Sequence, residues 1–97
     1  MTITAADLRA ALVLLCEHWG KGRYYNSVTG CYCAAGAVAK VKGILTEPPY
    51  YNADPEMENE LRDVLQLDEE VYEWNDASTQ AEVVSAFEEA IRRLETE

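Results

Sequence analysis

The chain is poor in the residues from which several kinds of protein are built. Its 97 residues include one histidine, one phenylalanine, three prolines and three cysteines. It lacks a run of about 18 apolar residues, which argues against a transmembrane helix. Residues 1–7 lack the basic and then apolar order of a signal peptide. We therefore expect a single domain spanning residues 1–97, in the cytoplasm and without a membrane partner.

Three cysteines are too few and too oddly numbered for a disulfide framework. We expect reduced thiols, with Cys16 and Cys33 packed as small apolar side chains. Cys16 with His18, and Cys31 with Cys33, would supply four zinc ligands. Helix positions two apart point in different directions, however, and structural zinc pairs are usually spaced more widely. The sequence therefore predicts no metal and no cofactor.

Basic residues are scarce in the second half of the chain. Residues 1–46 hold two acids and five bases, a net charge of +3, whereas residues 47–97 hold sixteen acids and three arginines, a net charge of −13. This field repels phosphates, so we expect no direct binding of nucleic acid. The acids are interpreted as solvated helix faces, or as a surface for a basic protein partner.

Apolar spacing predicts a mainly α fold of about four helices packed around one small core. The first helix runs from Ala5 to His18 behind a capping box. Two short strands around residues 26–30 form a β-hairpin before the second helix. That helix begins near Cys33, and a third follows Asp54-Pro55. A further turn over residues 67–72 is broken by residues 75–77, and a capping box at residues 79–82 opens the last helix.

The order of these motifs resembles a known family. Trp19 precedes a glycine-rich loop, and Cys33-Ala34-Ala35-Gly36-Ala37 opens a small-residue helix. Trp74-Asn75-Asp76 then precedes Thr79-Gln80-Ala81-Glu82-Val83 and an amphipathic helix. The pattern is similar to domain-of-unknown-function family 6197, a group of small actinobacterial and actinophage proteins with no assigned activity. The resemblance covers residues 8–91 and implies a phage or actinobacterial origin, with a role directed at a host protein.

A thiol site is one candidate for chemistry. Cys33 lies at a predicted helix N-terminus, where the helix dipole lowers a thiol pKa. His18 is the single histidine, and Asn75 or Asp76 would orient it, as in thiol-dependent hydrolases. The alternative is that Cys33 packs in the core and that Asn75 and Asp76 hydrogen-bond freed backbone groups.

A binding surface is the other candidate. The leading hypothesis is a non-enzymatic module that binds a protein partner through loop tyrosines or acidic helix residues. An acidic DNA-mimic inhibitor is a further alternative, because carboxylates three and four apart share one helix face and imitate phosphates. The residues predicted to contact a partner are Tyr24, Tyr25, Tyr50, Tyr51, Glu56, Glu60 and Asp63.

Overall fold

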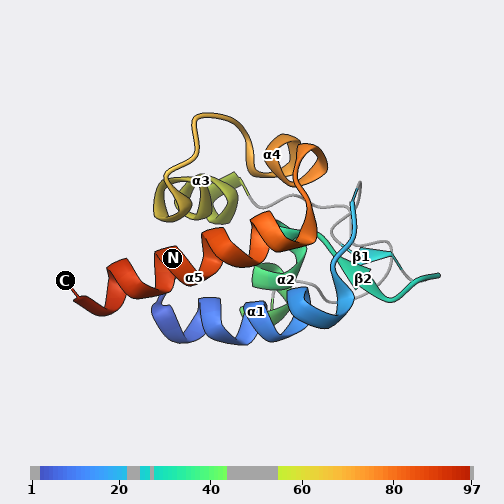
Figure 1. Cartoon of the computed structure of the whole chain (residues 1–97), viewed down its shortest axis with the longest axis horizontal. Coiled ribbons are helices and arrows are strands. Elements are labelled where there is room, and N and C mark those ends of the chain that lie inside the picture. Colours follow the sequence, from blue (N-terminus) through green and yellow to red (C-terminus); the bar gives the residue numbers. More distant parts are fainter. Residues whose placement is uncertain (1–2, 22–24, 27, 44–54, 97) are drawn as a thin grey trace.

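The computed structural model describes residues 3–21, 25–26, 28–43 and 55–96, and it is mainly helical (Figure 1). The predicted class and the hairpin are confirmed, but these residues form five helices rather than about four. The elements are α1 (Ala5–His18), β1 (Tyr25–Asn26), β2 (Cys31–Tyr32), α2 (Ala34–Val41), α3 (Pro55–Leu65), α4 (Val71–Ala77) and α5 (Gln80–Thr96).

The extra helix is α4, and the prediction that residues 75–77 break a helix was wrong. The break lies earlier, at Gln66, which adopts a left-handed conformation with φ of 58°. The N–H of Leu67 donates to the carbonyl of Arg62 (3.0 Å), and the N–H of Gln66 donates to that of Asp63 (3.1 Å). This is a Schellman ending, which glycine usually provides. Without a glycine, the sequence carried no clear stop signal.

Helices α1 and α5 lie side by side and run in opposite directions (Figure 1). Each begins with a capping box, Thr4 with Asp7 in α1 and Thr79 with Glu82 in α5. The first residue of α5, Gln80, donates its Nε2 to the carbonyls of Leu15 (2.8 Å) and Cys16 (3.0 Å). These carbonyls belong to the last turn of α1, where no intrahelical donor remains for them. Gln80 at the start of α5 therefore supplies hydrogen bonds to carbonyl groups at the end of α1.

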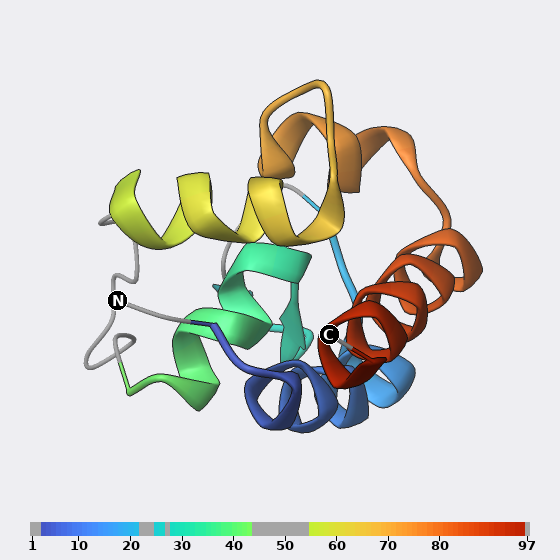
Figure 2. The same ribbon diagram turned by 90° about the vertical axis from the view of Figure 1, so that its left-hand side faces the viewer.

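Helix α2 occupies the middle of the helical assembly (Figure 2), and its residues 34–39 are all buried. Most of these residues are alanines or a glycine, so the neighbouring helices approach closely. Its C-terminal end is tied to α1 by an ion pair between Lys42 Nζ and Asp7 Oδ2 (3.1 Å).

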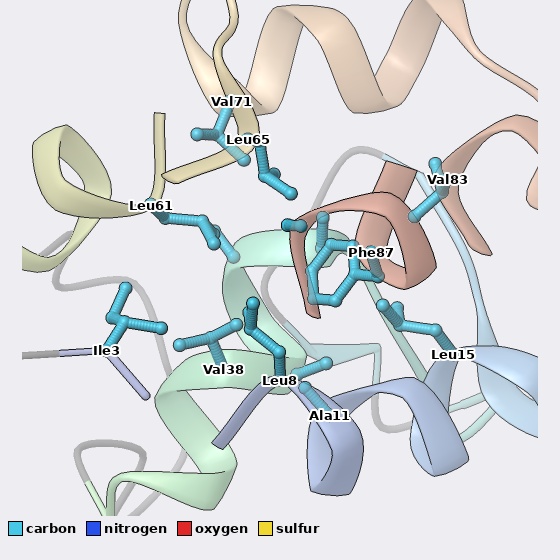
Figure 3. Close-up of a cluster of buried hydrophobic side chains, with 14 of the residues drawn as sticks. Ile3, Leu8, Ala11, Leu15, Val38, Leu61, Leu65, Val71, Val83 and Phe87 are labelled. Carbon is cyan, nitrogen blue, oxygen red and sulfur yellow. The ribbon is translucent and has the colours of Figure 1, made fainter. Parts of the chain in front are cut away.

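The core is assembled around α2 from all of the helices. Phe87 of α5 is fully buried, among side chains from α1 and α3 (Figure 3). The labelled side chains nearest to Phe87 come from segments far apart in sequence. They belong to one cluster of buried hydrophobic residues, which is the core. The chain thus folds as one packed unit within the described residues.

The hairpin joins the end of α1 to the start of α2. Tyr25 pairs with Tyr32 and Asn26 with Cys31, and the N–H of Gly20 donates to the carbonyl of Tyr32 (2.9 Å). A Cβ atom on Gly20 would stand 2.8 Å from Cβ of Cys31. Glycine at this position therefore permits the close approach of the two backbones.

Candidate functional site

Asn75 makes the most extensive polar contacts in the buried part of the molecule. It lies on the inner face of α4 and is completely buried. Its Oδ1 accepts hydrogen bonds from the indole Nε1 of Trp19 (2.8 Å) and the backbone N–H of Ala34 (2.9 Å). Its Nδ2 donates to the carbonyl of Gly20 (3.0 Å). One side chain thus joins the segment after α1, the first residue of α2, and α4.

Cys33 sits at the N-cap of α2, as predicted. Its Sγ accepts a hydrogen bond from the N–H of Gly36 (3.3 Å). Asn75 and Cys33 therefore satisfy two of the N–H groups that the first turn of a helix leaves without partners. The alternative in which Cys33 packs in the core and Asn75 bonds freed backbone groups agrees with this arrangement.

The electrostatic surroundings of Cys33 oppose thiolate formation. The side chain is 3% exposed, and burial raises the pKa of the Cys33 thiol to about 11. Hydrogen bonds from the backbone of Gly36 and Ala35 lower the pKa only in part, and the negative charges of Asp76 and Glu58 raise it further. At pH 7 about one thiol in ten thousand is ionised at such a pKa.

His18 lies away from this network of hydrogen bonds. It ends α1 with its side chain 49% exposed, and its Nε2 is 3.7 Å from Oε2 of Glu17. Both lone pairs of the Asn75 carbonyl oxygen are occupied by Trp19 and Ala34, so that oxygen cannot also orient an imidazole. Cys33 and Asn75 are brought close through α2, whereas His18 faces solvent.

The remaining cysteines are not grouped for a metal. Cys16 is exposed, so the expectation that it packs as a buried apolar residue was wrong. The reason is that α1 carries apolar residues all round, and its pattern does not show which side faces inward. In the described part of the chain, no three His, Cys, Asp or Glu side chains gather in a way that would hold a metal ion.

The resemblance drawn from the sequence is confirmed by comparison with protein families. The chain matches DUF6197, a family of unknown function, over residues 1–93. The chain belongs to this family. No curated protein and no solved structure matches it. Three of the motifs that carried the resemblance meet at Asn75, because they contribute Trp19, Ala34 and Asn75 itself. In this DUF6197 protein these motifs hold the helices together.

Most of the tyrosines predicted to bind a partner lie outside the described residues. These are Tyr24, Tyr50 and Tyr51. Tyr25 is described only as part of β1, where its backbone pairs with Tyr32. The role of these four tyrosines stays a prediction.

The acidic row on α3 is only partly open to solvent. Glu56 and Asp63 are exposed, whereas Glu60 between them is half-buried. Its Oε2 is buried and has no hydrogen-bond partner among the described residues. The row therefore presents Glu56 and Asp63 to solvent more fully than Glu60.

The structure adds an exposed tyrosine that the sequence pattern did not single out. Tyr72 on α4 is 52% exposed. A hydrogen bond with the Glu73 carboxylate, and the negative charge of that group, raise the pKa of Tyr72. Glu70 and Glu58 act in the same direction. The signal that could have identified it is the run of acids on both sides of Tyr72, because such a run favours a polar surface over the core.

One base of the second half, Arg62, partly neutralises this acidic surface, whereas Arg92 and Arg93 lie on α5. Arg62 pairs with Glu70 across the turn between α3 and α4 (3.1 Å). Arg92 and Arg93 both contact Glu89 on α5, and Arg93 also donates to the carbonyl of Val64 (2.7 Å). The three arginines are thus engaged with neighbouring groups. No helix among the described residues is long and apolar enough to cross a membrane.

Proposed function

We propose that this protein is a non-enzymatic binding module that takes up a basic protein segment on the surface formed by Tyr72, Glu73, Glu70 and Glu58. The observation that carries the proposal is the exposed ring of Tyr72, which lies among carboxylates at the junction of α3 and α4. An aromatic ring beside carboxylates suits an arginine, whose guanidinium stacks on the ring while its N–H groups pair with the acids.

Two further features support a binding role over catalysis. The thiol of Cys33 is buried and its pKa is raised, which is the opposite of what a nucleophilic cysteine requires. The acidic excess of residues 47–97 also favours approach of a basic partner and speeds the encounter. Tyr24, Tyr25, Tyr50 and Tyr51 remain proposed as additional contacts.

The proposed setting is the cytoplasm, as an accessory protein of phage or actinobacterial origin that acts on a host protein. The DNA-mimic inhibitor is a special case of the same proposal, in which the basic partner normally binds DNA. No observed contact favours this special case over other basic partners, so the experiment below separates them.

The test is affinity capture from bacterial lysate with the wild-type chain, Tyr72→Ala, Glu73→Gln and the control Glu88→Gln, which changes an exposed acid on α5. We expect a basic protein that is retained at low salt and released at high salt. Its affinity should fall at least about tenfold with Tyr72→Ala and less with Glu73→Gln, because an aromatic anchor contributes more than one exposed charge. Glu88→Gln should bind as the wild type does.

A partner retained equally well by Tyr72→Ala would contradict the proposed surface, and the absence of any specific basic partner would contradict the function. Once a partner is in hand, duplex DNA is added as a competitor. If duplex DNA displaces this protein from its partner, the two compete for one site on the partner, and this result would identify the DNA-mimic case. A partner that DNA does not displace identifies an ordinary acidic docking module.

A further inference from the structure

The outer side of α1 is unusually apolar for an exposed helix face. Helix α1 forms one edge of the molecule in both ribbon views (Figures 1 and 2). Its exposed residues are the apolar Ala6, Ala10, Val13 and Cys16 together with Arg9, Glu17 and His18, and Val13 is 63% exposed. A helix that carries apolar residues on all sides is ordinarily covered on all sides. Four of the seven exposed residues of α1 are apolar, so its outer face has the mixed composition of an interface, although the rest of the described chain does not cover it.

A recess of about 470 Å³ lies beside this face, between α1 and α5. Its apolar lining comes from Leu12, Val13 and Cys16 of α1 and from Ile91 of α5. The charged residues that line it are Arg9 of α1 and Glu88, Arg92 and Glu95 of α5. Two are positive and two are negative, so the recess carries no net charge in a chain whose net charge is −10.

This charge balance decides which occupant fits. A basic segment would be favoured by an acidic rim, and an acidic segment by a basic rim. A rim with equal numbers of both charges is complementary to itself, as an isologous contact between identical chains requires. It is also a face on which two acidic chains meet without the repulsion that the second half of the chain would impose.

We propose that the face formed by α1 and α5 binds a second copy of this chain, with α1 packed antiparallel against α1 of the second copy about a two-fold axis near Val13. This inference is independent of the proposed function, because Tyr72 is not part of the face. Arg9 and Glu17 lie four residues before and after Val13. In an antiparallel contact centred on Val13, Arg9 of each copy therefore lies near Glu17 of the other.

The contacts that these charges make within one chain do not prevent Arg9 from pairing with Glu17 of a second copy. Arg9 pairs with Glu95 on α5, but the two side chains are 55% and 41% exposed. Exposed ion pairs of this kind contribute little to stability, so re-pairing costs little. Helix α1 has 14 residues and is about 21 Å long. Two adjacent helices of this length offer on the order of 400 Å², less than the roughly 800 Å² per partner of a standard interface. We therefore expect a weak dimer that dissociates on dilution.

The first test is sedimentation equilibrium of the full chain from about 1 to 500 μM. The wild type should shift from monomer to dimer across this range. Val13→Glu should weaken dimerisation at least about tenfold, because it places two like charges at the axis. The matched control is Val28→Glu, at a valine that is 92% exposed in the turn between β1 and β2. The control should dimerise as the wild type does, after allowance for its added charge.

The second test separates specific pairing from net charge. Arg9→Glu makes the chain more acidic and Glu17→Arg makes it less acidic. If net charge alone governs association, Glu17→Arg should strengthen the dimer. Our proposal expects each single variant to weaken it several-fold and the double variant Arg9→Glu/Glu17→Arg to restore it. Circular dichroism checks that each variant remains helical.

A monomeric wild type at 500 μM would overturn the inference, as would a dimer that Val13→Glu leaves intact or that Glu17→Arg strengthens. The variant Tyr72→Ala serves as a further control and should leave dimerisation unchanged. Loss of partner binding in Tyr72→Ala with an unaltered dimer would show that the two surfaces are separate. The failure of one proposal therefore does not decide the other.

Discussion

Helices α1 and α5 lie against each other, yet their sequences are organised in opposite ways. In α5 the buried residues Val83, Phe87, Ala90 and Ile91 recur at helical spacing, and most exposed positions carry charge. In α1 the buried residues are Leu8, Ala11 and Leu15, but apolar side chains such as Val13 are also exposed. The polar pattern of α5 sets its orientation. The orientation of α1 is set by its neighbours, which leaves apolar side chains such as Val13 exposed.

The largest effect is expected at Asn75, which holds the segment after α1 through Trp19 and Gly20. Asn75→Ala leaves three groups without their buried partner: the Trp19 indole N–H, the Ala34 N–H and the Gly20 carbonyl. We expect a loss of about 2–4 kcal/mol in the free energy of unfolding, measured by urea denaturation. Hydrogen exchange should accelerate first at the C-terminal end of α1 and the start of α2.

The matched control is Asn59→Ala, the same change at an exposed asparagine of α3. It should alter the free energy of unfolding by no more than about 0.5 kcal/mol. Equal effects of the two substitutions would show that Asn75 does not connect the segments as described.

A second prediction compares one valine from each helix. Val83 of α5 is fully buried and Val13 of α1 is 63% exposed. Val83→Ala removes two methyl groups from the core and should cost about 2 kcal/mol. Val13→Ala should be neutral or slightly stabilising, because alanine has the higher helix propensity. Thermal unfolding of the monomer at low concentration measures both, and a large loss for Val13→Ala would show that the outer face of α1 is covered within the monomer.

The smallest effect concerns the start of α1. Both helices begin with a capping box, but the box of α1 is also tied to Lys42. Burial raises the pKa of Asp7, but the hydrogen bond from the Thr4 backbone and the Lys42 ammonium outweigh it, so the pKa lies below the usual 3.8. The stabilisation is therefore complete above pH 3.8 and is lost as the pH falls through the lower pKa of the folded state.

Asp7→Asn should cost about 0.5–1 kcal/mol at pH 7 and should remove this part of the acid dependence. Melting temperatures at pH 7, 4 and 2.5 measure the change. If the wild type and Asp7→Asn lose stability in parallel on acidification, the ion pair with Lys42 does not contribute as the geometry indicates.

Several elements could be predicted because their signals are local. The capping box at Thr4 marks the start of α1, and Gly20 beyond Trp19 marks its end. The turn around Gly30 indicated the hairpin. The end of α3 could not be predicted in this way, because Gln66 takes the left-handed conformation that glycine usually provides. The helical state of Asn75 was also missed, because asparagine before a capping box ordinarily indicates a turn.

The candidate site also has features that local sequence signals predicted and features that they did not. The helix N-terminus at Cys33 was predicted from the sequence, and it suggested a lowered thiol pKa. The structure places Cys33 3% exposed beneath acidic groups, so its pKa is raised instead. Burial and distant charges depend on segments far apart in the chain, and no local pattern encodes them.

The sequence by itself determined that this is a small, mainly helical, acidic protein of the DUF6197 family, with Cys33 at the start of a small-residue helix. Local spacing and capping chemistry are sufficient for the helices, composition for the charge, and the order of the motifs for the resemblance to the family. Only the tertiary structure decided that Asn75 turns inward to join three segments, that Tyr72 turns outward among carboxylates, and that Val13 is left exposed. Each of these depends on which residues from distant parts of the chain compete for the same buried space.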